Sequence, residues 1–166
     1  MALEIEKKFI IKKLSTDALE ALGARKKEIN QSYLLPSSDF PVRRIRKVVF
    51  EGNTTYYYTL KRPSSGSFTR EEIEQEISEN QYLGLQKEGD FSLNEIVKTR
   101  FIIEGDGLVY EVDRFPFFVD FDLLEIELPS EDFSFTIPKE IEILKEVTTD
   151  YRFTNIALAK EIPNVF

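Results

Sequence analysis

The sequence predicts a mainly β fold of the α+β class, with about seven or eight largely antiparallel strands and a few short helices. Two observations support this prediction. Polar and apolar residues alternate with the two-residue period of strands over most of the chain. The connections between the alternating stretches are mostly short, whereas parallel strands need long crossover connections.

The first predicted strand covers the first eleven residues. Glu4, Glu6 and Lys8 stand two residues apart there, between apolar residues. Because successive side chains of a strand point to opposite faces, the two carboxylates and the ammonium group share one face. The opposite face is mostly apolar. Taken alone, this pattern is typical of a strand that is half exposed to solvent.

One helix and four further strands are predicted between this strand and residue 77. Ser15 or Thr16 can cap the helix, and Gly23 suits its end. The helix covers residues 14–23, a flexible loop covers 62–68, and the strands cover 31–35, 42–50, 54–61 and 70–77. The strands at 42–50 and 54–61 are predicted to form a hairpin.

The second half of the chain is predicted to hold two helices and three strands. Ser78 and Gln81 have the spacing of a capping box, which opens a short helix that ends before Gly89. The other elements are a hairpin of strands 95–104 and 108–115 that turns at 105–107, a strand over 119–128, a loop over 129–138 and a helix over 150–161.

Length, composition and charge restrict the class of protein. The 166 residues suit one domain spanning 1–166, and the 42% of hydrophobic residues is too high for a disordered chain. The net charge of −8 argues against a general nucleic-acid binder, although bases can gather in one cavity. No signal peptide or membrane-length apolar run is present, so we expect a cytoplasmic protein with no membrane partner.

Cysteine and histidine are both absent from the sequence. Their absence excludes disulfides, thiolate nucleophiles, histidine-based acid–base or triad chemistry, and the usual ligands of zinc. Any metal must therefore be bound by oxygen atoms, which favours Mg²⁺, Mn²⁺ or Ca²⁺.

Charged residues recur on one face of most predicted strands, in pairs or triplets of one sign. Like charges this close repel one another, so something must compensate them. One explanation is a sheet with a solvated charged face and helices on its other face. The other is a closed barrel with the charges inside, around a metal ion bridged to a polyphosphate. The charged positions are Lys8, Arg44, Arg46, Lys61, Arg70, Lys98, Arg100, Glu4, Glu6, Glu72, Glu74, Glu111, Asp113, Glu125 and Glu127.

The order of these short motifs resembles that of the CYTH superfamily, also called triphosphate tunnel metalloenzymes. Glu4-Ile-Glu6-Lys-Lys8 is similar to the E-x-E-x-K signature of that family. The other similar segments are Gln31-Ser-Tyr-Leu34, Arg44-Ile-Arg46, Thr59-Leu-Lys61, Arg70-x-Glu72-x-Glu74, Lys98-Thr-Arg100, Glu111-Val-Asp113, Glu125-Ile-Glu127, Glu146-Val-Thr148 and Asp150-x-Arg152-Phe-x-Asn155. The resemblance extends from Glu4 to about Leu158.

The resemblance implies an eight-stranded antiparallel closed barrel with a charged lumen, a small-molecule triphosphate substrate, and Mg²⁺ or Mn²⁺ as cofactor. The metal ligands it implies are Glu4, Glu6 and Glu127, with Glu72, Glu74 and Asp113 tuning the lumen or holding a second metal. The phosphate-binding residues it implies are Lys8, Arg44, Arg46, Lys61, Arg70 and Arg100. The catalytic residues it implies are Lys98, Glu125 and Glu127. Arg152 either binds phosphate or anchors the last helix through Asp150.

We therefore predict metal-dependent hydrolysis of a triphosphate, with inorganic tripolyphosphate as substrate and pyrophosphate and phosphate as products. Three alternatives share the same groups: a class IV adenylyl cyclase, a thiamine triphosphatase, and a polyphosphate-binding module without catalytic activity. We expect a monomer or a homodimer that binds no nucleic acid.

Overall fold

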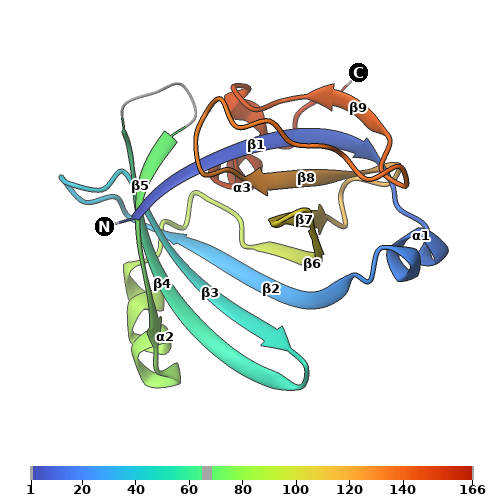
Figure 1. Cartoon of the computed structure of the whole chain (residues 1–166). Helices are drawn as coiled ribbons and strands as arrows, with labels where there is room; N and C mark the ends of the chain where they lie inside the picture. Colours follow the sequence, from blue (N-terminus) through green and yellow to red (C-terminus); the bar gives the residue numbers. More distant parts are fainter. Residues whose placement is uncertain (1, 65–68, 166) are drawn as a thin grey trace.

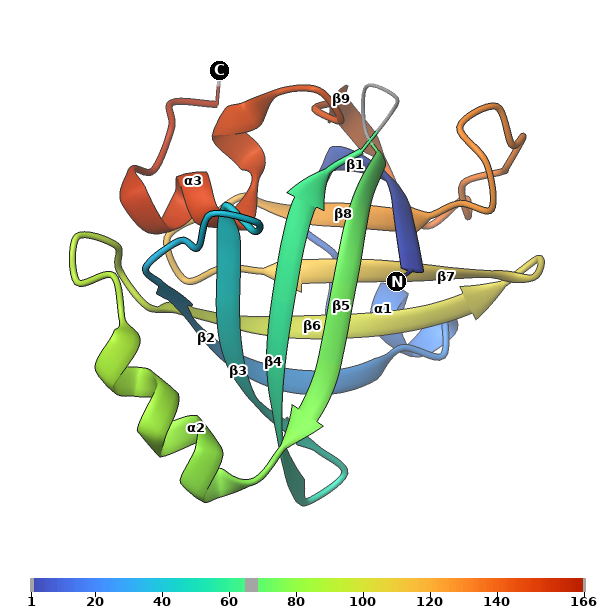
Figure 2. The ribbon, with the colours of Figure 1, turned by 90° about the vertical axis from the view of Figure 1, so that its left-hand side faces the viewer.

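The computed structural model describes residues 2–64 and 69–165. Within them, nine strands form one sheet in the spatial order β5-β4-β3-β2-β6-β7-β8-β1-β9. The strands are β1 (Ala2–Lys12), β2 (Arg25–Leu34), β3 (Val42–Phe50), β4 (Asn53–Pro63), β5 (Thr69–Ile77), β6 (Ile96–Gly105), β7 (Leu108–Arg114), β8 (Phe121–Glu127) and β9 (Ile143–Glu146). Strand β5 also pairs with β1, so eight antiparallel strands close into a barrel (Figure 2). The predicted barrel is confirmed.

Strand β1 closes the barrel because different parts of it pair with different neighbours (Figure 1). Residues 2–5 pair with β5, and residues 6–12 pair with β8 on the other side. Where β5 no longer covers β1, residues 9–11 pair with β9 instead. The short strand β9 was not predicted.

Two tight hairpins match the predicted turns. Glu51 and Gly52 join β3 to β4 with φ angles of 51° and 79°, and Asp106 and Gly107 join β6 to β7 with φ angles of 53° and 75°. Two consecutive positive φ angles are typical of type I′ turns, whose twist matches that of antiparallel strands. These turns fix the register that brings the inward residues of neighbouring strands together.

The helices are short and lie outside the barrel wall or against one end of it (Figures 1 and 2). The helices are α1 (Thr16–Ala21), α2 (Glu79–Leu85) with the 3₁₀ turn η1 (Gln86–Glu88), η2 (Tyr151–Phe153) and α3 (Asn155–Lys160). The capping box of α2 is present, with reciprocal hydrogen bonds between Ser78 and Gln81. No helix in the described ranges has the length and apolar composition needed to cross a membrane.

Several predicted boundaries were wrong. Strand β2 begins at Arg25 rather than at residue 31, because it pairs with β6 over residues 25–31. The predicted helix over 150–161 is two pieces, since the hydroxyl of Thr154 caps a new helix by accepting from the amide of Ala157. Residues 62–63 belong to β4 rather than to a loop. Residues 65–68 of the predicted flexible loop lie outside the described residues.

Apolar residues occupy the outer face of the barrel and also one end of its interior. Outside, the buried residues of β1, β7 and β8 are covered by α1 and by Phe135 and Ile137, while Tyr82 of α2 packs on Ile45. Inside, the charged face of β1 ends at Lys8 and continues as Ile10. A buried cluster fills this end of the lumen, formed by Ile10, Tyr33, Ile96, Phe115, Phe118, Phe121, Leu123, Val147, Phe153, Leu158 and Ala159.

Candidate active site in the barrel lumen

The lumen contains a charged cavity of about 280 Å³. In the described part of the chain, seven basic and seven acidic side chains line it, so its formal charges balance. The bases are Lys8, Lys27, Arg44, Arg46, Lys61, Arg70 and Arg100, and the acids are Glu4, Glu6, Glu72, Glu74, Glu111, Glu125 and Glu127. Twelve of the fourteen residues predicted for the site are in this set. The exceptions are Lys98 and Asp113.

The register of the barrel explains why these residues meet. Residues that are direct partners on adjacent strands have their side chains on the same face of the sheet. Arg44 pairs with Thr59, Lys61 with Glu72, and Lys8 with Glu125. Every second side chain of each strand therefore points into the lumen, and these inward side chains meet around the barrel.

Two arginines of the cavity have no carboxylate partner among the described residues. Arg44 and Arg70 form no ion pair with any residue in the described ranges. The hydroxyl of Tyr33 is the hydrogen-bonding neighbour of Arg44, and the buried Nε of Arg44 has no partner. Arg46 is bound to Glu74 through Nη2, but its buried Nε also lacks a partner. These groups leave donors free to bind an anion.

Two acids of the cavity are likewise unpaired. Glu6 of β1 and Glu127 of β8 are direct partners in the register, and neither forms an ion pair or hydrogen bond within the described residues. Burial and the charge of Glu125 raise the pKa of Glu6 to about 8. Burial, Glu4 and Glu111 raise the pKa of Glu127. The repulsion between these carboxylates makes the position favourable for a cation.

The ammonium group of Lys61 lies near two carboxylates. Its Nζ lies 2.9 Å from Glu4 and 3.9 Å from Glu72. Burial opposes ionisation of Glu4, but Lys61 and a hydrogen bond from Glu72 outweigh it and lower the pKa of Glu4 to about 2. Burial and the charge of Glu4 raise the pKa of Glu72 to about 7, although Lys61 acts against the shift. Glu4 is therefore the ionised member of this pair.

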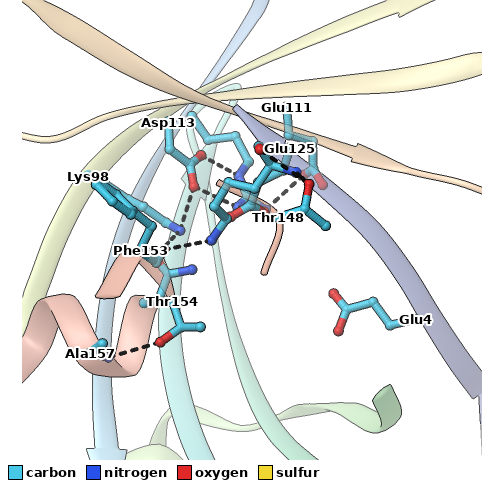
Figure 3. Close-up of polar contacts among 12 residues, drawn as sticks. Glu4, Lys98, Glu111, Asp113, Glu125, Thr148, Phe153, Thr154 and Ala157 are labelled. Atoms are coloured by element: carbon cyan, nitrogen blue, oxygen red, sulfur yellow. Dashed lines mark hydrogen bonds and ion pairs between the residues drawn. The ribbon is translucent and has the colours of Figure 1, made fainter. Parts of the chain in front are cut away.

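A network of ion pairs connects residues that line the cavity with the buried residues Asp113 and Lys98 (Figure 3). Asp113 binds Lys98 at 2.7 Å and the Nε of Arg100 at 2.7 Å. Arg100 also contacts Glu111 at 2.8 Å and Glu125 at 3.4 Å. Figure 3 shows Glu4 apart from this network.

Lys98 was expected to act on the substrate, and Asp113 to tune the lumen or to hold a second metal or water. The structure places both outside the lining of the cavity. Neither side chain has any exposed surface, and neither lines the cavity. Burial lowers the pKa of Lys98 to about 8, against the opposing effect of Asp113. Asp113 instead binds Arg100, and Lys98 binds the same carboxylate.

The C-terminal segment supplies contacts that the motifs did not reveal. The Nζ of Lys8 donates to the carbonyl oxygen of Phe153 at 2.9 Å, and the Nζ of Lys98 donates to Asn155 at 3.1 Å. The backbone amide of Lys8 donates to Thr148 at 3.1 Å. A carbonyl group has no sequence signature, and Asn155 was noted only as part of a motif.

Several further lining residues were not assigned to the site from the sequence. Among them are Lys27, Tyr57 and Glu111. Lys27 was missed because strand β2 begins earlier than predicted. Arg152 lies outside the cavity and makes a bidentate ion pair with Asp150, at 3.0 and 2.7 Å.

Comparison with known proteins gives the family. The profile of the CYTH domain matches residues 2–153. The chain belongs to the CYTH family. An inorganic triphosphatase of Nitrosomonas europaea is 33% identical over 164 residues, which cover 96% of this chain and 99% of that protein.

Solved CYTH-like structures share the barrel. The crystal structure of the inorganic triphosphatase NE1496 is 28% identical, with 99% of each chain covered and a TM-score of 0.58. The PH1819 protein of Pyrococcus horikoshii OT3 is 21% identical, with 75% of this chain and 80% of that chain covered and a TM-score of 0.53. The similarity to the PH1819 protein shows only that the two chains share a fold.

The donor set of this CYTH barrel suits a hard divalent cation. In residues 2–64 and 69–165, no three acidic side chains already converge as a metal site, since Glu4 and Glu125 are turned toward lysines. Glu6 and Glu127 remain as a facing pair of free carboxylates. Mg²⁺ is commonly held by one or two carboxylates together with water and substrate phosphates. The residues present therefore fit such an ion.

Proposed function

We propose that this protein is a divalent-metal-dependent triphosphatase that hydrolyses inorganic tripolyphosphate to pyrophosphate and phosphate. The observation that carries the proposal concerns the cavity as formed by the described residues: Arg44 and Arg70 lack acidic partners there, while Glu6 and Glu127 lack basic ones. The family membership and the 33% identity to an inorganic triphosphatase support it.

The charge balance of the cavity supports the metal requirement. Seven bases face seven acids, so a triphosphate that entered alone would add several negative charges to a neutral, partly buried space. A divalent cation that enters with the substrate offsets part of that charge and also relieves the repulsion between Glu6 and Glu127. We propose Mg²⁺ or Mn²⁺, because all the available ligands are oxygen atoms.

The proposed substrate-binding residues are the bases that reach the cavity. Arg44 and Arg70 offer unpaired guanidinium groups, and Arg46 and Lys61 can exchange their acidic partners for phosphate oxygens. Lys8 is held by its ion pair with Glu125, and Arg100 by its ion pair with Asp113, so both keep fixed positions. Glu6 and Glu127, with Glu4 beside them, would hold the metal, and Glu74 keeps Arg46 in place.

The reaction is the attack of water on a terminal phosphorus, with cleavage of the bond to the bridging oxygen. A bound divalent ion supplies Lewis-acid stabilisation of the phosphate oxygens. The guanidinium groups stabilise the charge that develops on the departing pyrophosphate. Within residues 2–64 and 69–165, the carboxylate of Glu127 accepts no hydrogen bond from a base, and that of Glu72 lies 3.9 Å from Lys61, so both are available to orient the water and take its proton. Lys98, Asp113 and Glu125 act in this proposal by positioning Lys8 and Arg100.

The test uses purified protein freed of metal with EDTA. Tripolyphosphate, ATP and thiamine triphosphate are supplied in turn, with Mg²⁺, Mn²⁺ or no metal, and the products are identified by ³¹P NMR. We expect pyrophosphate and phosphate from tripolyphosphate, only when metal is present. Cyclic AMP from ATP would indicate an adenylyl cyclase, and preferred cleavage of thiamine triphosphate a thiamine triphosphatase. Tight binding without turnover would indicate a polyphosphate-binding module.

The same proposal includes a single tunnel domain over residues 1–166, a cytoplasmic location, and a monomer or homodimer. Gel filtration with light scattering measures the oligomeric state directly.

A further inference from the structure

Lys27 is a base of the cavity that no motif of the family resemblance includes. It is half-buried on β2 and lines the same cavity as Arg46 and Arg100. Its register partners are Phe50 on β3 and Arg100 on β6, and its Nζ lies 5.0 Å from the centroid of the Phe50 ring. The side chain therefore lies along an aromatic ring with its charge directed at the lumen.

In the described part of the chain, Lys27 lacks the carboxylate partner that Lys8 and Lys61 have. In residues 2–64 and 69–165 it forms no ion pair, although its direct register partner is a second cation. Like charges directly opposite each other on adjacent strands are destabilising. The nearby acid Glu111 is already bound to Arg100 at 2.8 Å, and Arg25 is bound to Glu51 at 2.6 Å. Burial and the charges of Arg100, Arg46 and Arg25 lower the pKa of Lys27 despite the opposing effect of Glu111.

Lys27 extends the set of free bases along the lumen. On β2, Tyr33 lies opposite Arg44, and Lys27 lies six residues before it, roughly 20 Å along the strand. Arg46 lies opposite Gln31, between these two levels, and has a buried Nε for which the described residues supply no partner. Arg100 lies at the level of Lys27. An anion bound at Arg44 and Arg46 would therefore have another cation without an ion-pair partner among the described residues, Lys27, farther along the lumen.

We propose that Lys27 is a further phosphate-binding residue, which contacts the end of the bound triphosphate that lies away from Arg70. This assignment rests on the proposed function, since it names an additional residue for the same substrate. A phosphate oxygen there would accept a charge-assisted hydrogen bond from Lys27. Its negative charge would also reduce the repulsion between Lys27 and Arg100.

The test compares Lys27→Met with Lys26→Met. Methionine keeps an unbranched stem against Phe50 and removes only the charge. Lys26 is the neighbouring residue of β2 on the outer face, with 63% of its side chain exposed and an ion pair to Glu28. We expect Lys27→Met to raise KM for tripolyphosphate with Mg²⁺ about tenfold or more, with kcat changed less than about threefold. We expect Lys26→Met to match wild type and Lys27→Arg to recover most of the affinity.

Calorimetric titration of tripolyphosphate, in EDTA and in Mg²⁺, gives a readout that does not depend on turnover. The Kd should rise about tenfold in Lys27→Met and stay unchanged in Lys26→Met. An increase of less than about threefold would overturn the assignment. If wild type binds tripolyphosphate but does not hydrolyse it, the proposed function fails, while a selective loss of binding in Lys27→Met still supports this residue. If wild type binds no tripolyphosphate in either condition, both are overturned.

Discussion

Glu6 and Glu127 are direct partners on β1 and β8, and neither carboxylate has an ionic partner in the described part of the chain. Two carboxylates in register and without a base are unfavourable in a partly buried site. Their arrangement distinguishes them from Glu125, which is held by Lys8 at 3.0 Å. This arrangement is the reason that we propose the pair as the binding position of an external cation.

Replacing Glu6 by Gln should abolish most turnover without weakening the fold. The amide keeps the shape of the side chain but removes a charge that binds metal, so we expect kcat with tripolyphosphate to fall about 100-fold or more. The melting temperature in EDTA should be unchanged or higher, because a repulsive interaction is lost. Steady-state kinetics and calorimetry measure the two quantities.

Glu142→Gln provides the matched control for this substitution. Glu140 and Glu142 also form an E-x-E sequence, but the side chain of Glu142 is 65% exposed and forms an ion pair with Lys12 at 4.0 Å. Its replacement should leave kcat within about twofold of wild type, since an exposed ion pair contributes little. Near-wild-type activity of Glu6→Gln would show that the metal is bound elsewhere.

The stability of the metal-free protein should decrease as the pH rises from about 5 to about 8. The folded protein raises the pKa of Glu6 to about 8 and that of Glu72 to about 7, against ordinary values near 4.5. The folded state therefore binds more protons than the unfolded state in this interval, and its stability is lost as the pH passes through the folded values. Lys98, with a lowered pKa of about 8, adds stability only at higher pH.

Thermal unfolding in EDTA at several pH values measures this dependence. Glu6→Gln should flatten the decrease, and saturating Mg²⁺ should reduce it, because both remove the cost of the ionised Glu6 carboxylate. A melting temperature that rises steadily from pH 5 to pH 8 in EDTA would contradict the assignment of raised pKa values to these groups.

Arg43 and Arg44 are adjacent on β3 and should respond oppositely to substitution. Arg44 points into the cavity without an acidic partner, whereas Arg43 on the outer face donates to Leu35, Tyr58 and Glu88. Arg44→Met should lower kcat/KM about 100-fold with little change in stability. Arg43→Met should keep activity and lower the free energy of unfolding by about 1–2 kcal/mol. Kinetics and urea unfolding of both variants test the pair, and equal losses of activity would contradict the inward and outward assignments.

The alternation of charged and apolar residues predicted which side chains share a face of the sheet. Residues two apart on a strand point to the same side, so the charged residues of each motif must lie together. Arg44 and Arg46, or Glu4 and Glu6, could be placed together from spacing alone. The depth of a residue along the lumen could not be predicted in this way. Lys98 and Arg100 share a face, yet Lys98 is wholly buried and Arg100 reaches the cavity. Depth depends on the tilt of the strands and on how they close the barrel, which are properties of the whole fold.

Features that depend on long-range contacts were also missed. Strand β9 has four exposed residues and forms only because β1 offers an unpaired edge beyond β5. The apolar end of the lumen combines Ile10, Leu123 and Phe153, which lie far apart in the sequence. Lys27 was overlooked because the polar sequence at the start of β2 lacks the aromatic and branched residues that mark strands.

Asp113 should be the most important single acid for stability. Its carboxylate is fully buried and accepts from Lys98 at 2.7 Å and from Arg100 at 2.7 and 2.9 Å. Asp113→Asn leaves two buried cations without their shared anion, so the free energy of unfolding should fall by about 3–5 kcal/mol. Lys98→Met should cost less, because Arg100 continues to compensate Asp113.

The double variant Lys98→Met/Asp113→Asn distinguishes the effect of losing the Lys98–Asp113 ion pair from a general loss of core packing. If the loss in Asp113→Asn comes from an unpaired buried lysine, removing that lysine should restore at least about 1 kcal/mol, giving a positive coupling in a double-mutant cycle. Urea unfolding of the wild type, both single variants and the double variant supplies the four values. Strictly additive losses would show that Lys98 and Asp113 stabilise the barrel independently, and the positioning role proposed for the pair would then have to be abandoned.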